Sequence, residues 1–144
     1  MNDISPPNPD PARIKELLSQ ARTIAVVGLS PDSSRDSHKV ASYLLEHGYR
    51  VIPVNPKEQT ILGQKVYPDL AAVDQPVDLV DVFRASEHVG PIAAAAVAMG
   101  AKALWLQLGV RNDQAAAQAS QAGLAVVQDK CIKVEHRALL GQAK

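Results

Sequence analysis

The sequence contains a single cysteine, no excess of charge of either sign and no long apolar run. One cysteine excludes an internal disulfide and a zinc site built from cysteines. Lysine and arginine together number 15, as do aspartate and glutamate, so nothing indicates nucleic acid or an anionic membrane as the main partner. No apolar stretch approaches the roughly 18 residues that a membrane-spanning helix requires.

Motifs typical of metal sites, hydrolysis and secretion are also missing. The four histidines, at positions 38, 47, 88 and 136, show no H-x-x-x-H or H-E-x-x-H spacing, so no metal site is predicted. No spacing indicates a Ser-His-Asp or Cys-His-Asn triad, which favours a binding protein without catalysis of its own. The first residues, MNDISPPNPDP, have neither a basic start nor an apolar signal core, and we expect a cytoplasmic protein.

Short apolar runs alternate with helical patterns along the chain. Strands are expected at Thr23–Val27, Arg50–Val54, Val77–Phe83, Ala103–Leu108 and Leu124–Val127. Helices are expected from Pro11, capped by Asp10, and at Ser37–His47, Ser86–Met99, Asn112–Ala122 and Ile132–Leu140. Between them, residues 57–76 are irregular, with a short strand at Lys65–Tyr67 and a helical turn at Asp69–Val73.

This alternation predicts right-handed crossovers between parallel strands, with helices on both faces of the sheet. The predicted fold is therefore a three-layer, Rossmann-like α/β domain with the strand order 3-2-1-4-5. We expect residues 10–144 to form this one domain. Residues 1–9, which include three prolines, are expected to be a flexible lead-in.

The loop after the first strand is the best candidate for a binding site. Gly28 closes the strand, a polar loop follows, and a helix begins near Asp36 or Ser37, either of which can cap it. Free amides and the positive end of the dipole at a helix start attract anions, and Arg35 adds a cation. The loop thus predicts a phosphate site. Only the first glycine of G-x-G-x-x-G is present, so an ordinary turn, with Arg35 as a surface cation, remains the alternative.

The end of the second strand separates the possible nucleotides. Ligands of such sheets bind at the carboxyl ends of the strands, and an NAD site normally has an acidic residue after the second strand that holds the ribose 2′-hydroxyl. This sequence has Asn55-Pro56-Lys57 there instead. The missing acid and the nearby lysine favour a phosphorylated ribose, which leaves coenzyme A, with a 3′-phosphate, and NADP, with a 2′-phosphate.

Four segments carry a resemblance to a known family: GLSPDSSRDSHKVASYLLEHGYRVIPVNP, VDLVDVFRASEHV, ALWLQLGV and VVQDKCIKVEH. Together they resemble the stand-alone CoA-binding domain proteins, which are similar in fold to the N-terminal domain of the succinyl-CoA synthetase α subunit. The resemblance covers Ala21 to Leu140 and implies that the ligand is coenzyme A or an acyl-CoA. The chain has no counterpart of the synthetase's phosphohistidine segment, so ligase activity is not implied.

The resemblance also implies a set of binding residues. Those implied for the phosphates are Gly28, Ser30, Arg35 and Ser37. Those implied to flank the adenosine part are Val54, Asn55 and Pro56, beside the Lys57 cation. Those implied to line the groove are Phe83 and Arg84, and the site extends to Gln107, Lys130 and Cys131.

Two other functions remain open. An NADP-linked oxidoreductase would need a pair such as Tyr-x-x-x-Lys, which none of the three tyrosines forms. A redox protein would use Cys131 with CoA as its thiol partner, because nearby lysines and a helix start favour a thiolate. The alternative for Cys131 is that it is a small buried apolar residue.

Trp105 is expected in the core. Asp81 is either a structural partner or a site residue, because an acid in a buried strand needs hydrogen bonds.

Overall fold

A five-stranded parallel sheet forms the centre of the computed structural model, which describes residues 6–141. Its strands are β1 (Thr23–Val27), β2 (Arg50–Val54), β5 (Leu79–Val82), β6 (Ala103–Leu106) and β7 (Ala125–Val127). All five lie within the predicted ranges. Their residues are almost entirely buried, as expected for a parallel sheet covered on both faces.

The predicted strand order is wrong. The sheet runs β2-β1-β5-β6-β7, so the third predicted strand lies between the first and the fourth and not outside the second. β5 pairs with β1 in parallel, with Val26 opposite Asp81. The edge of β2 where the third strand was expected is instead occupied by a single bridge between Val54 and Tyr67. The Tyr67 amide donates to the Pro53 carbonyl oxygen at 3.0 Å.

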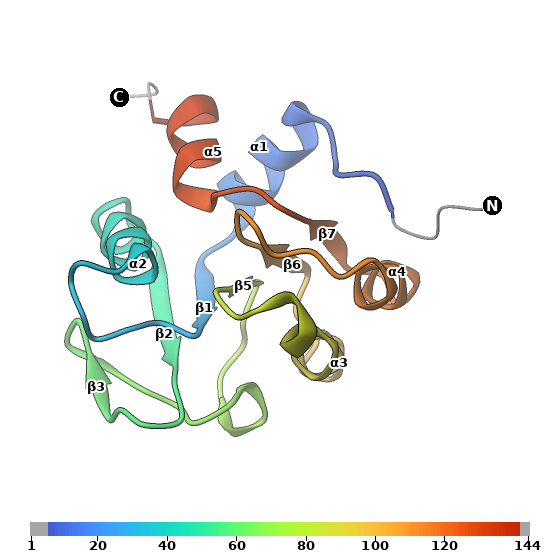
Figure 1. Cartoon of the computed structure of the whole chain (residues 1–144). Helices are drawn as coiled ribbons and strands as arrows, with labels where there is room; N and C mark the ends of the chain where they lie inside the picture. Colours follow the sequence, from blue (N-terminus) through green and yellow to red (C-terminus); the bar gives the residue numbers. More distant parts are fainter. Residues whose placement is uncertain (1–5, 142–144) are drawn as a thin grey trace.

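Helices cover both faces of the sheet, which confirms the three-layer architecture (Figure 1). The helices on one face are α1 (Pro11–Gln20), α2 (Asp36–Glu46) and α5 (Ile132–Leu139). The elements on the other face are α3 (Val89–Ala98), α4 (Asp113–Gln121) and the 3-10 turn η1 (Leu70–Ala72). The remaining short elements are the antiparallel pair β3 (Thr60–Ile61) and β4 (Gln64–Lys65) and the 3-10 turn η2 (Ser86–His88).

The two faces differ in the size of the side chains that fill them. Small alanines of α3 and α4, such as Ala96 and Ala116, are fully buried against the sheet and allow these helices to approach it closely. The face under α1, α2 and α5 holds Trp105, which is fully buried and donates from its indole nitrogen to the Lys130 carbonyl oxygen at 2.8 Å. Trp105 is therefore a core residue, as predicted.

The chain before α1 is attached to the sheet. Asn8 donates to the Gln128 carbonyl oxygen and accepts from the Gln128 amide, at 2.9 and 2.8 Å. Asp10 accepts from the Arg13 amide and so caps α1, as predicted. Residues 1–5 of the expected lead-in lie outside the described residues. Within residues 6–141, no helix has the length and apolar character to cross a membrane.

Helices α2 and α5 are joined by a polar contact in an otherwise apolar layer. Tyr43 of α2 and His136 of α5 share a hydrogen bond of 2.8 Å between the Tyr43 hydroxyl and the His136 Nδ1. Burial lowers the pKa of His136, and the neighbouring His47 lowers it further. Because the neutral imidazole is favoured here, this contact fixes the spacing of the two helices without adding a buried charge.

Candidate functional site

The sheet reverses its direction of winding between β1 and β5. From β1 the chain proceeds to β2 on one side, and from β5 it proceeds to β6 on the other. Ligands of open α/β sheets bind beyond the carboxyl ends of the strands at such a point. Gly28 and Phe83 follow these two strands, and the Gly28 amide donates to the Val54 carbonyl oxygen at 2.9 Å. Three strand ends are thus held together at the reversal.

The loop after β1 is ordered by its own polar groups. The Ser30 amide donates to the Ser37 hydroxyl at 3.0 Å, and the Asp32 amide donates to the Ser30 hydroxyl at 3.1 Å. Asp32 in turn accepts from the amide and the hydroxyl of Ser34. These bonds from Ser34, and then the charge of Arg35, lower the pKa of the Asp32 carboxyl. The loop therefore has a defined shape before any ligand binds.

The start of α2 differs from the prediction in an informative way. Neither Asp36 nor Ser37 caps the helix: the cap position is Arg35, which has no side chain that bonds to the first-turn amides. Ser37 is buried and its hydroxyl serves the Ser30 amide instead. Within residues 6–141, the amides of Asp36 and Ser37 consequently have no hydrogen-bond acceptor. Open amides at a helix start are the groups that bind anions.

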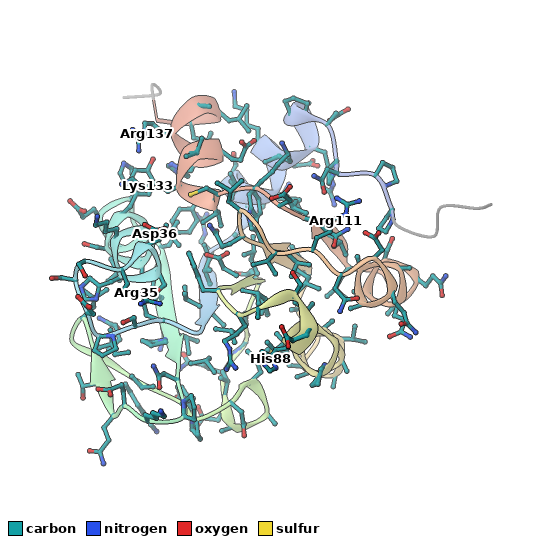
Figure 2. The ribbon with its side chains drawn as sticks, viewed as in Figure 1. Arg35, Asp36, His88, Arg111, Lys133 and Arg137 are labelled. Carbon is teal, nitrogen blue, oxygen red and sulfur yellow. The ribbon has the colours of Figure 1, made fainter. Side chains whose placement is uncertain are left out.

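Three adjoining pockets lie along the carboxyl ends of the strands. The loop pocket has a volume of about 380 Å³ and is lined by Gly28, Ser30, Ser34, Arg35, Asp36, Ser37 and Phe83. Asp36 and Ser37, whose amides have no acceptor, line this pocket together with Arg35, whose side chain is exposed. In Figure 2, Arg35 and Asp36 lie at the amino end of α2, with Lys133 on α5 near them. The loop pocket is the most polar part of the groove and is suited to an anion.

The proline pocket lies on one side of the loop pocket and shares Gly28 with it. Its volume is about 240 Å³, and its lining includes Val54, Pro56, Pro68, Leu70, Arg84, Pro91 and Ile92. Most of the lining is apolar and comes from β2, η1 and α3, and its two charged residues are Asp69 and Arg84. Such a lining is suited to a flat, apolar-faced group.

The cysteine pocket lies on the other side and shares Phe83 and Asp36 with the loop pocket. Its volume is about 540 Å³, and its lining includes Lys39, Gln107, Leu108, Val110, Cys131, Lys133 and Val134. Cys131 is the residue that precedes α5, is partly buried and forms no disulfide. Arg84 lines both this pocket and the proline pocket, so the three pockets form one groove.

Ten of the thirteen residues expected to bind a ligand line this groove, and Asn55, Lys57 and Lys130 do not. Asn55 links two strand ends: its side-chain amide donates to the Leu29 carbonyl oxygen at 2.9 Å and its Oδ1 accepts from the Lys57 amide at 2.8 Å. Lys57 is exposed next to Pro56. Lys130 contributes its carbonyl oxygen to Trp105.

Several lining residues were not found from the sequence. Pro68 and Leu70 belong to the irregular stretch after β2, which has no periodic pattern to place it. Ile92 is an apolar residue of α3 that gives no sign of facing a pocket. For Leu108 a signal does exist, because it is a large apolar residue at the carboxyl end of the expected strand Ala103–Leu108, where polar residues are usual.

Asp81 lies in the middle of the sheet, two residues before Phe83. It is fully buried, and neither of its carboxylate oxygens has a hydrogen-bond partner among residues 6–141. Burial raises the pKa of this carboxyl well above its ordinary value. Burial therefore favours the neutral form of Asp81, and Asp81 lines none of the three pockets.

Two known proteins are similar to this one over nearly the whole chain. The protein YneT of Bacillus subtilis, which is uncharacterized, is 41% identical over 129 residues, or 90% of this chain and 96% of that one. The structure of a hypothetical protein from Pyrococcus horikoshii OT3 matches with a TM-score of 0.90 and 39% identity, over 92% of this chain and 94% of that one.

A larger protein contains a related domain. The dinucleotide-forming acetyl-coenzyme A synthetase 1 of Ca. Korarchaeum cryptofilum, in complex with phosphate and ADP, matches with a TM-score of 0.69 and 25% identity, over 77% of this chain and 26% of that one. The family model described as CoA binding domain matches residues 22–137, which include all of the groove described above. The chain therefore belongs to the CoA-binding domain family.

Proposed function

We propose that the protein binds coenzyme A or an acyl-CoA in the groove along the strand ends, without catalysis of its own. The observation that carries this proposal is the uncapped start of α2. The amides of Asp36 and Ser37 have no acceptor, the Ser37 hydroxyl belongs to the same turn, and Arg35 adds an exposed cation. The diphosphate of coenzyme A would accept from these groups in the loop pocket.

The adenosine part would occupy the proline pocket. A purine ring has two apolar faces, and Pro56, Leu70 and Ile92 offer apolar contacts from three different elements. The proline pocket shares Gly28 with the loop pocket, so an adenosine bound there remains next to its own diphosphate. The shape of the groove thus supports one continuous placement of the nucleotide.

Lys57 would hold the 3′-phosphate of the ribose. Its position follows from Asn55, whose side chain accepts from the Lys57 amide and donates to the loop after β1. Asn55 is in this account a positioning residue, which fixes the direction in which the chain leaves β2. The position after β2 holds no acid of the kind that normally binds the ribose of NAD. The acid that lines the proline pocket, Asp69, comes from a different segment, and its Oδ1 accepts from the Ala72 amide at the start of η1.

Calorimetric titration with CoA, dephospho-CoA, NADP and NAD tests the proposal. CoA is expected to bind most tightly, and dephospho-CoA about tenfold or more weakly, since a charged hydrogen bond to phosphate contributes roughly 1.5–3 kcal/mol. In Lys57→Ala the difference between CoA and dephospho-CoA should largely disappear. Tighter binding of NADP than of CoA would contradict the proposal and favour an NADP-linked protein instead.

A further inference from the structure

We infer that the cysteine pocket receives the acyl end of the ligand, so that the protein prefers an acyl-CoA with an apolar acyl group over free CoA. This inference rests on the proposed function, because it extends the same ligand from the loop pocket. The adenosine is placed in the proline pocket, on one side of the diphosphate. The pantetheine arm then leaves past Phe83, which lines both the loop pocket and the cysteine pocket.

Two exposed apolar side chains line this pocket. Leu108 is 70% exposed and Val134 is 53% exposed, and these are the large apolar residues left exposed among residues 6–141. Leu108 lies in the loop after β6 and Val134 lies in α5, yet both line the cysteine pocket. Since buried apolar surface is stabilising, a ligand with an apolar end would gain affinity by covering them.

Gln107 adds a donor at the base of the same pocket. Its side chain is 4% exposed, and its Oε1 accepts from the Ile132 amide at 3.1 Å. Because an N–H group can only donate, this bond fixes which end of the amide faces α5. The Gln107 Nε2 group has no acceptor among the described residues. The buried side-chain atoms without a partner among these residues are the two oxygens of Asp81, so the Gln107 Nε2 is accessible in the pocket that Gln107 lines. The carbonyl oxygen of a thioester would accept a hydrogen bond from it.

Affinity as a function of acyl length is the first test. CoA, acetyl-CoA, butanoyl-CoA and hexanoyl-CoA are titrated into the wild-type chain and into the double variant Leu108→Ser, Val134→Ser. In the wild type, affinity should rise with chain length, by up to about fourfold for each methylene group that is fully buried, since one such group contributes ~0.8 kcal/mol. The variant should lose this gain and bind free CoA within about twofold of the wild type.

The carbonyl contact is tested with a thioether. S-hexyl-CoA lacks the carbonyl oxygen of hexanoyl-CoA and should bind the wild type about threefold to tenfold more weakly, the range of one neutral hydrogen bond. In Gln107→Glu, which keeps an acceptor for the Ile132 amide, this difference should shrink. A difference that persists unchanged in Gln107→Glu would contradict the assignment of the Gln107 donor.

The outcomes separate this inference from the function on which it rests. If no CoA compound binds, the proposed function fails. If CoA and hexanoyl-CoA bind equally well and the serine variant changes neither, CoA binding is upheld and the acyl assignment is wrong. If succinyl-CoA binds more tightly than butanoyl-CoA and Lys39→Ala, Lys133→Ala removes the preference, the pocket takes acidic acyl groups, and an apolar acyl group is ruled out as the preferred ligand.

Discussion

The backbone carbonyl oxygen of Phe83 fills the space in which a side chain at Gly28 would have to lie. A Cβ atom at Gly28 would be 2.5 Å from that oxygen, and the φ angle of Gly28 is +84°. The ends of β1 and β5 therefore approach each other at the place where the sheet reverses. The Phe83 backbone and the Arg84 side chain, whose Cδ would be 3.0 Å from such a Cβ, therefore leave no space for a side chain at Gly28.

Replacement of Gly28 by alanine should destabilise the fold strongly. The positive φ costs about 1 kcal/mol for a residue with a Cβ, and the contact with backbone that cannot rotate away adds about 1–3 kcal/mol. Gly48→Ala is the matched control, because Gly48 also has a positive φ but would meet nothing within 4 Å. Urea unfolding should show a clearly larger loss for Gly28→Ala. Equal losses would mean that the strand ends separate easily.

Arg35→Ala should weaken CoA binding about tenfold or more without loss of stability. A charged hydrogen bond to phosphate contributes roughly 1.5–3 kcal/mol, whereas the exposed Arg35 side chain belongs to no core cluster. Arg50→Ala is the matched control, since Arg50 is exposed at the first residue of β2, at the opposite edge of the sheet. Calorimetry and thermal unfolding measure the two effects. Equal affinities for both variants would make Arg35 an ordinary surface cation.

Cys131 should form a mixed disulfide with CoA when the protein is incubated with CoA disulfide. The Cys131 thiolate attacks one sulfur of the disulfide and the other half leaves as CoA thiolate, so no further oxidant is needed. Intact mass should show one CoA adduct that is absent in Cys131→Ser and is reversed by dithiothreitol.

The rate distinguishes a bound reagent from a free one. CoA disulfide should react faster than glutathione disulfide with the wild type, and Arg35→Ala should slow the first reaction but not the second. Equal rates for both disulfides would mean that Cys131 is an exposed thiol outside the path of the ligand. Absence of any adduct would remove the interpretation of this chain as a redox protein that uses Cys131.

Asp81 should make the free energy of unfolding depend on pH in the direction opposite to that of most carboxylates. Its pKa is raised in the folded chain from the ordinary 3.8, so above that pH the unfolded chain releases a proton that the folded chain retains. The free energy of unfolding should therefore fall as pH rises from about 4 towards the folded pKa, by at most about 1.4 kcal/mol per pH unit. Asp81→Asn removes this slope. Parallel stability curves of the two proteins between pH 3.5 and 7 would show that Asp81 does not retain its proton.

The strand positions follow from the sequence because apolar runs such as Thr23–Val27 can only be buried strands between helices. The strand order does not follow in the same way. A buried strand at Val77–Phe83 is compatible with a place outside β2, as predicted, and with a place next to β1, as observed. Both orders allow right-handed crossovers. The decision depends on Tyr67, which bonds to the edge of β2 and closes it. A short strand was expected at Lys65–Tyr67, but the sequence does not show that it would bond to the edge of β2.

In the candidate site, too, the sequence predicts the residues of a local motif but not those placed by long-range packing. Gly28 and Arg35 lie in a motif whose chemistry is local, a strand end followed by a helix start, and the structure places them together. Free amides at the start of α2 were expected, but with Asp36 or Ser37 as the cap of the helix. In the structure the Ser37 hydroxyl instead accepts from the Ser30 amide. Pro68 and Ile92 line the groove only because segments far apart in the sequence pack together. Such packing could not be predicted from this single sequence.

A crystal structure of the wild-type chain with bound CoA tests the central claim most directly. The account predicts the diphosphate within hydrogen-bond distance of the Asp36 and Ser37 amides and of Arg35, with the adenine ring between Pro56 and Ile92. A diphosphate bound away from the start of α2, with these amides left open, would contradict it.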